Sequence, residues 1–227
     1  MRWALAHSKN IPAVRLIDML GPSSVVQFAQ TLGIASPLRP NLSLALGTSE
    51  LTLLELTAAY AAFADQGQYI KPYGITEVRN DEGKVIWRTK PEKRIALSRA
   101  SAAIITDMLT AVIKEGTGRR AGRLIGPLAG KTGTTNAFKD ALFIGYSPTI
   151  AAGVWVGNDD ASSLGPQETG AKAALPIWTA FMEKASAGRP QSYFDIPDGV
   201  RTIYMDARTG LSLPEGASGG VKALVRQ

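Results

Sequence analysis

The chain has 227 residues with 25 basic and 19 acidic side chains, which gives a formal net charge of +6. Its 45% hydrophobic content is enough to build a sizeable core, and its 23 glycines and 13 prolines stay below the level typical of low-complexity chains. The lack of cysteine excludes disulfides and thiolate metal sites, and the single histidine excludes most histidine-based ones. We therefore predict a globular protein without a metal or other cofactor.

The positive charge does not indicate nucleic acid binding. The two basic clusters, residues 88–94 and 119–123, contain no aromatic residues that could stack on bases, and no zinc-finger or helix-turn-helix pattern accompanies them. The longest apolar stretch, residues 51–64, is shorter than the ~18–20 apolar residues of a membrane span. The first ten residues also lack the apolar region of a signal peptide. We expect no nucleic acid partner, and no anchor or export signal within these residues.

Helical patterns dominate the first half of the chain. Asn10 is a candidate cap for the first helix, Ser23 or the next serine starts the second, and Ser98 caps the last. Thr52-x-x-Glu55 has the pattern of a capping box at the start of an alanine-rich helix. The four predicted helices cover residues 11–20, 23–33, 52–67 and 98–116.

Strand patterns follow in two groups. Residues 75–79 and 84–88 are joined by a turn-forming Asn-Asp-Glu-Gly segment, which predicts an outlying hairpin. A second group of three short runs with tight turns predicts an antiparallel meander, and a helix over residues 171–187 follows it. The meander strands are residues 128–134, 140–146 and 150–156. Because helices and antiparallel strands are segregated, we predict the α+β class.

The segment Gly130-Lys131-Thr132-Gly133-Thr134 carries the clearest chemical signal. A phosphate-binding loop would need one more residue before the lysine and a helix after it, whereas a strand pattern follows. On an edge strand, Lys131 would set a positive potential, and the hydroxyls of Thr132 and Thr134 would bind a carboxylate. Gly133 would let a substrate backbone approach, and the Thr134 N–H would be one oxyanion donor.

Ser8-Lys9-Asn10 is a second candidate segment. A Ser-x-Asn triplet is common by chance, and on its own it also fits a helix cap before Ile11. Its position at a predicted helix junction, upstream of Lys131, matches the second of the three elements that accompany Lys-Thr-Gly in acyl-serine enzymes.

Together these segments resemble the transpeptidase domain of class A (bifunctional) penicillin-binding proteins, which cross-link peptidoglycan. The resemblance implies an antiparallel sheet with flanking helices on one face, plus a helical subdomain, with the site between them. It implies a partial transpeptidase domain at residues 1–188 and a C-terminal tail at residues 189–227. The stretches that carry the resemblance are residues 4–13, 44–63, 115–121, 129–136, 139–140, 143–146 and 153–159.

The resemblance also implies roles for individual residues. Ser8 relays protons to the leaving group, Asn10 holds the substrate amide, and Lys131 supplies positive potential to that relay. Thr132 and Thr134 bind the terminal carboxylate of a D-Ala-D-Ala stem peptide or the carboxylate of a β-lactam. No cofactor is implied.

One family element is missing from these residues. The family nucleophile lies in a Ser-x-x-Lys motif upstream of Ser-x-Asn, and no serine of this chain has a lysine three positions later. Without that motif no acyl-enzyme can form, and the oxyanion donor that the nucleophile itself supplies is lacking. We therefore expect a fold that is incomplete at the N-terminus and a chain that is inactive alone. Leu142, where the family pattern has an aromatic residue, is a smaller departure.

Other functions remain open at this point. A serine β-lactamase would use the same motifs, but a deacylating Glu-x-x-x-Asn arrangement is absent. A non-catalytic remnant would bind peptidoglycan or a partner protein through the remaining cleft, and NTP binding is disfavoured by the short loop. The resemblance places the protein in the periplasm or on the outer face of the cytoplasmic membrane, with the family's membrane anchor upstream of these residues.

Overall fold

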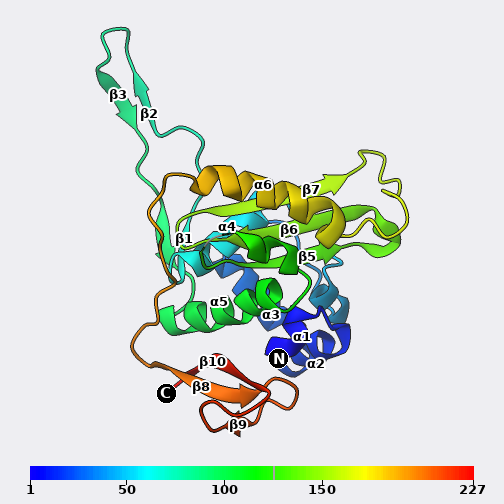
Figure 1. Cartoon of the computed structure of the whole chain (residues 1–227). Helices are drawn as coiled ribbons and strands as arrows, with labels where there is room; N and C mark the ends of the chain where they lie inside the picture. The colour runs from blue at the N-terminus through cyan, green and yellow to red at the C-terminus, as the bar shows by residue number, and fades with distance from the viewer. Residues whose placement is uncertain (125) are drawn as a thin grey trace.

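The computed structural model describes residues 1–124 and 126–227. Its centre is an antiparallel sheet in the order β5-β6-β7, so the predicted meander is confirmed (Figure 1). Its strands are β5 (Ala129–Thr134), β6 (Asp140–Tyr146) and β7 (Ala151–Gly157). Helices cover both faces of this sheet, so the expectation of helices on one face is wrong. These helices are α4 (Leu53–Ala64) and α5 (Arg99–Lys114) on one face and α6 (Leu175–Ser186) on the other.

Aromatic side chains fill the core between the sheet and α6. Phe143 on β6 packs edge-on against Trp178 with ring centroids 4.8 Å apart, and both are fully buried. The Trp178 indole N–H donates to the Ala152 carbonyl at 3.0 Å, which satisfies its buried polar atom. Gly145 makes room for this ring, since a Cβ atom there would lie 2.7 Å from Trp178. The close contact fixes α6 over the sheet.

The opposite face of the sheet packs on α4 and α5. Tyr146 on β6 is fully buried, and its hydroxyl shares a 2.9 Å hydrogen bond with Thr106 of α5. Tyr60 of α4 meets the Tyr146 ring edge-on, and burial raises the pKa of Tyr60 to about 12. Because a glycine stands at position 153, α4 can approach β7: a Cβ atom there would lie 2.2 Å from the Thr57 hydroxyl. Helices therefore pack on both faces of the sheet and hold its strands in place.

Short helices at the N-terminus form a separate layer beside α5 (Figure 1). The prediction that Asn10 caps the second of them is wrong: Asn10 is already the first helical residue, and Lys9 precedes it without a side-chain cap. The third begins at Pro22 rather than at Ser23, because the missing N–H and fixed φ of proline suit a first helical position. The elements of this layer are α1 (Arg2–Ala6), α2 (Asn10–Leu20), α3 (Pro22–Thr31) and the 3-10 helix η1 (Leu42–Leu46).

The predicted hairpin is confirmed and projects away from the body (Figure 1). Its strands are β2 (Glu77–Arg79) and β3 (Val85–Arg88), and β1 (Gln68–Ile70) pairs with β4 (Lys93–Ile95) at its base. The predicted capping box at Thr52 and Glu55 is also present. These local features form as their sequence patterns predict.

The C-terminal region contains more structure than its sequence pattern indicated. A second antiparallel sheet, in the order β10-β8-β9, lies beneath α5 (Figure 1). Among the described residues, no helix combines the length and apolar character needed to cross a bilayer. The remaining elements are η2 (Arg119–Arg123), η3 (Asn136–Phe138), the π-helical turn η4 (Gly170–Ala174), β8 (Val200–Asp206), β9 (Ser212–Leu213) and β10 (Gly220–Arg226).

Candidate active site

The Lys-Thr-Gly-Thr segment forms most of β5, one of the two outer strands of the central sheet. Among the residues that the structure describes, only β6 pairs with this strand, so the opposite edge of β5 has no sheet partner there. Gly133 lies opposite Leu142, and a Cβ atom at Gly133 would come within 3.3 Å of the Leu142 Cβ. The glycine therefore allows the two strands to pack closely just where the candidate site lies.

Ser8 and Lys131 are in contact. Ser8 lies in the short connection between α1 and α2 with a φ of 50°, a left-handed conformation that is uncommon for a residue with a side chain. The Lys131 ammonium donates hydrogen bonds to the Ser8 hydroxyl and to the Thr132 carbonyl, the latter at 2.9 Å. The two segments that the sequence singled out thus meet at one place.

The surroundings of Lys131 change its acidity. Desolvation by burial lowers its pKa from 10.5 to about 8, because the charged ammonium loses water and no carboxylate of the described residues pairs with it. A group with a pKa near 8 exchanges its proton far more readily at neutral pH than an ordinary lysine does. Lys131 is therefore suited both to carry positive charge and to pass a proton to the Ser8 hydroxyl.

Two hydroxyls on the same strand are held by neighbours that the sequence did not assign to the site. Thr132 Oγ1 lies 2.7 Å from the hydroxyl oxygen of Thr117, which follows α5. Thr134 Oγ1 accepts a 3.0 Å hydrogen bond from the Gly170 N–H. Thr117 belongs to a stretch that already carried the family resemblance, whereas no sequence signal pointed to Gly170. Both contacts leave each threonine hydroxyl with capacity for a ligand.

Asn10 does not take part in the contact between Ser8 and Lys131. Its side chain is exposed, and among the described residues it makes no hydrogen bond. Lys9 is also exposed, and its ammonium lies 5.4 Å from the centre of the Trp3 ring. Within residues 1–124 and 126–227, no three side chains of metal-binding type converge. The structure therefore brings together Ser8 and Lys131, with Thr132 next to them.

An aromatic side chain lies beside Leu142 on the neighbouring strand. Trp155 on β7 lies directly opposite Leu142 in the sheet register, and its indole N–H donates to the Asp140 carboxylate at 2.8 Å. Trp155 is 43% exposed, so it is accessible to solvent. Although position 142 has no aromatic residue, Trp155 provides an exposed aromatic side chain on the neighbouring strand.

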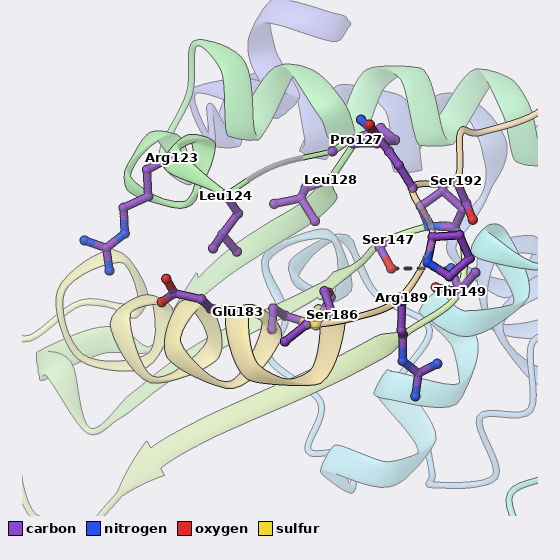
Figure 2. A pocket seen from close by; sticks show the side chains of 16 residues that line it. Arg123, Leu124, Pro127, Leu128, Ser147, Thr149, Glu183, Ser186, Arg189 and Ser192 are labelled. Atoms are coloured by element: carbon purple, nitrogen blue, oxygen red, sulfur yellow. Dashed lines mark hydrogen bonds between the residues drawn. The ribbon is translucent and has the colours of Figure 1, made fainter.

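A separate cavity of about 410 Å³ opens near the start of β5. Figure 2 shows its lining: Arg123 and Leu124 from the η2 region, Ser147 and Thr149 from the β6–β7 turn, and Glu183 and Ser186 from α6 are among its residues. None of the predicted site residues lines it. Its volume alone therefore does not make this cavity the candidate site, because it lies apart from the Ser8–Lys131 contact.

Comparison with known proteins identifies the class. Residues 1–183 match the family described as the penicillin binding protein transpeptidase domain. Penicillin-binding protein 1A of Aquifex aeolicus is 44% identical over 197 residues, which are 87% of this chain and 27% of that protein. The chain therefore belongs to the penicillin-binding protein transpeptidase family.

Solved structures agree with this assignment. The structure of penicillin-binding protein 1A from Haemophilus influenzae matches 98% of this chain with a TM-score of 0.90 and 28% identity, and the match covers 39% of that chain. PonA1 from Mycobacterium tuberculosis, solved in complex with penicillin V, matches 87% of this chain and 59% of its own with a TM-score of 0.76 and 26% identity. The chain spans about a quarter to a third of the length of the curated relatives it matches.

Proposed function

We propose that this chain supplies the proton-relay and carboxylate-binding half of a D,D-transpeptidase that cross-links peptidoglycan stem peptides through an acyl-serine. The observation that carries the proposal is the contact between Lys131 and Ser8 at the free edge of β5. Membership of the transpeptidase family supports it. The reaction would take place in the periplasm or at the outer face of the cytoplasmic membrane, where stem peptides are cross-linked.

The proton path follows from the hydrogen bonds. When a serine nucleophile attacks the carbonyl between the two D-alanines, the C–N bond breaks and the departing amine must gain a proton. Since the Ser8 hydroxyl accepts from Lys131, its own hydrogen is free to go to that amine. Lys131 then passes a proton to Ser8, and its lowered pKa, about 8, reduces the cost of that step.

The substrate carboxylate would bind to hydroxyls of the edge strand. Thr132 and Thr134 lie two residues apart on β5, so their side chains share one face of the strand. Nearby Lys131 adds positive charge that attracts the carboxylate. A β-lactam carries a carboxylate in the corresponding place, and the PonA1 structure in complex with penicillin V supports this ligand class. Asn10 would hold the substrate amide after a side-chain rotation.

The second part of the proposal is that the chain alone forms no acyl-enzyme. None of its serines has a lysine three positions later, the spacing of one helical turn that lets a neutral lysine accept the hydroxyl proton. Ser8 is a poor replacement for that nucleophile, because Lys131 is mostly protonated at pH 7 and donates to the Ser8 oxygen instead of accepting its proton.

Labelling with fluorescent penicillin tests the proposal. We would compare the chain alone with a chimera in which a Ser-x-x-Lys segment from a family member precedes Met1. The expected result is labelling of the chimera only, reduced at least about a hundredfold by Lys131→Ala and by Ser8→Ala, in line with the general contribution of acid–base groups. An unlabelled chimera that still binds cell-wall sacculi saturably would overturn the transpeptidase proposal in favour of a non-catalytic binding role.

A further inference from the structure

We propose that the turn Gly116-Thr117-Gly118, which follows α5, is the positioning element that fastens the connection carrying Ser8 to the strand carrying Lys131. This inference rests on the proposed function only in taking the Ser8–Lys131 contact as part of the active site. Thr117 itself would touch neither the scissile bond nor the nucleophile. It would act through Ala6 and Thr132.

Thr117 bonds to both sides of the site at once. Its backbone N–H donates to the Ala6 carbonyl at 3.1 Å, two residues before Ser8. Its hydroxyl lies 2.7 Å from that of Thr132, the residue after Lys131. One residue thus joins the end of α1 to the edge strand, and its two bonds flank the contact between Ser8 and Lys131.

Gly116 allows the turn to approach α1, and Gly118 allows it to pack against α5. A Cβ atom at Gly116 would lie 2.2 Å from the Ala6 carbonyl oxygen and 2.9 Å from the Val112 Cα, distances that real Cβ atoms do not reach. At Gly118 a Cβ atom would lie 2.9 Å from the Ile113 side chain. The Gly118 N–H donates to the Val112 carbonyl at 2.9 Å, which anchors the turn to the end of α5. The turn and the end of α1 are therefore in backbone contact with no room for a side chain.

The short α1 helix needs such an anchor. It has five residues, and helices of that length do not hold their place by their own hydrogen bonds. Its start is fixed by the ion pair of Arg2 with Asp107 on α5, at 2.5 Å, and its end by the Thr117 bond to Ala6. Ser8 follows at once in a left-handed conformation that neighbouring contacts must maintain. Ser8 and Lys9 also donate backbone hydrogen bonds to Leu5 and Ala4 within the same short segment. Apart from the Lys131 contact, the Thr117 bond to Ala6 is the hydrogen bond nearest to Ser8, among the described residues, that ties this segment to another part of the fold.

The Thr117 hydroxyl also has a chemical consequence at Thr132. Thr132 Oγ1 has one hydrogen and two lone pairs, and Lys131 Nζ lies 3.5 Å from it. If Thr117 donates to Thr132, the Thr132 hydrogen points away from the turn and is free for a ligand carboxylate. A Thr117 side chain without a hydroxyl would leave the Thr132 hydroxyl to rotate, and the ligand would then bear the cost of ordering it.

The first test uses the chain as it is and needs no catalysis. Lysine labelled with ¹³C at Cε gives an NMR titration of Lys131, with the resonance assigned by its loss in Lys131→Arg. Gly116→Ala should push the end of α1 away, admit water to Lys131 and raise its pKa from about 8 by one unit or more toward 10.5. The matched control is Gly122→Ala, where a new Cβ atom would meet its nearest neighbour at an ordinary 3.5 Å and should leave the titration unchanged. A folded Gly116→Ala protein with an unchanged Lys131 titration would overturn the proposal.

The second test covers the case in which Gly116→Ala does not fold. Thr117→Val keeps the shape and the backbone N–H but removes the hydroxyl, whereas Thr117→Ser keeps the hydroxyl. In the chimera, Thr117→Val should raise the penicillin concentration for half-maximal acylation about tenfold and leave the maximal rate within twofold. For Thr117→Ser, the half-maximal penicillin concentration and the maximal rate should each stay within threefold of the parent. Equal behaviour of the two variants would contradict the positioning role of the Thr117 hydroxyl.

The two proposals fail in different ways. If the parent chimera is not acylated, the proposed function is wrong, but the NMR titration still reports whether the turn holds Ser8 against Lys131. If the parent chimera is acylated and the titration of Gly116→Ala matches that of Gly122→Ala, the function stands and the turn has no positioning role.

Discussion

Lys131 donates a hydrogen bond to Ser8 although 123 positions separate the two residues in the chain. The pairing of β5 with β6 fixes the position of Lys131. The contacts of α1 with α5, and with the turn that follows α5, fix the position of Ser8. Burial at this meeting point lowers the pKa of Lys131 to about 8. A cation held in such a place opposes folding, so Lys131 lowers the stability of the protein.

Lys131→Met should stabilise the protein. At pH 7 the folded state carries the penalty of the desolvated ammonium, and its removal outweighs the lost hydrogen bonds, so we expect a gain of about 1–2 kcal/mol in the free energy of unfolding. Between pH 8 and 10.5 folded Lys131 releases its proton while the unfolded chain still holds it, so the penalty and the gain both fade over this range. Urea titrations at pH 7 and pH 10.5 measure the gain in unfolding free energy and its decrease at high pH. A Lys131→Met protein that is less stable at pH 7 would contradict this view of the site.

Local patterns predicted local structure well. The capping box of Thr52 and Glu55 and the hairpin turn at residues 80–83 depend only on near neighbours, and both form. The Lys-Thr-Gly-Thr segment lies on an edge strand as its pattern predicted.

Features that depend on distant contacts were not accessible from the sequence. The bond between Thr117 and Thr132 exists only because α5 and β5 pack together. The sheet of β8, β9 and β10 was missed because its strands alternate weakly between apolar and polar residues. Asn10 fails as a cap because the chain leaves Ser8 in a left-handed turn and enters the helix one residue earlier than predicted.

Glu55→Gln should weaken the N-terminal end of α4. The carboxylate accepts from the Ser36 hydroxyl at 2.5 Å, from the Ala35 N–H at 2.9 Å and from Thr52, and the Ser36 bond is the largest cause that lowers its pKa from 4.5 to about 2. Because the folded pKa is depressed, the stabilisation is present above pH 4.5 and is lost as the pH falls toward 2.

We expect Glu55→Gln to lower the free energy of unfolding by about 1 kcal/mol at pH 7, the usual size for a cap, and to match the parent near pH 2. Denaturant titrations across this range measure the effect, with exposed Glu50→Gln as control. A difference that stays constant down to pH 2 would show that the charge of Glu55 plays no part.

Asp107→Asn should loosen both α1 and the C-terminal sheet. The Asp107 carboxylate pairs with the Arg2 guanidinium at 2.5 Å, and the Asp107 and Arg2 side chains are only 18% and 11% exposed, respectively. The Asp107 carboxylate also accepts a hydrogen bond from the Leu224 N–H of β10 at 3.1 Å. Removing its charge leaves the Arg2 guanidinium buried without a counter-charge, so we expect a loss of about 2–3 kcal/mol in urea denaturation. The control is Asp195→Asn, whose pair with Arg99 is exposed and should cost at most about 0.5 kcal/mol. Equal losses for the two variants would refute the special role of Asp107.

The hairpin of β2 and β3 should be dispensable for folding. Its ion pairs and turn bonds stay within residues 75–89, and a two-stranded hairpin adds little stability of its own. Replacing residues 76–89 with a short Gly-Ser linker should leave the unfolding free energy within about 1 kcal/mol of the parent, because the Lys71 N–H bond to Glu92 keeps the ends together. Calorimetry measures this, and loss of the cooperative transition would contradict it.

Intact-protein mass spectrometry after incubation with penicillin tests the central claim most directly. The chimera with a Ser-x-x-Lys segment should gain the mass of one penicillin, and its Lys131→Ala variant should gain it at least about a hundredfold more slowly. The chain alone should keep its mass. A chain that alone gains the mass of a bound penicillin would show that one of its own serines is the nucleophile, and would contradict the division of the site between this chain and a Ser-x-x-Lys segment.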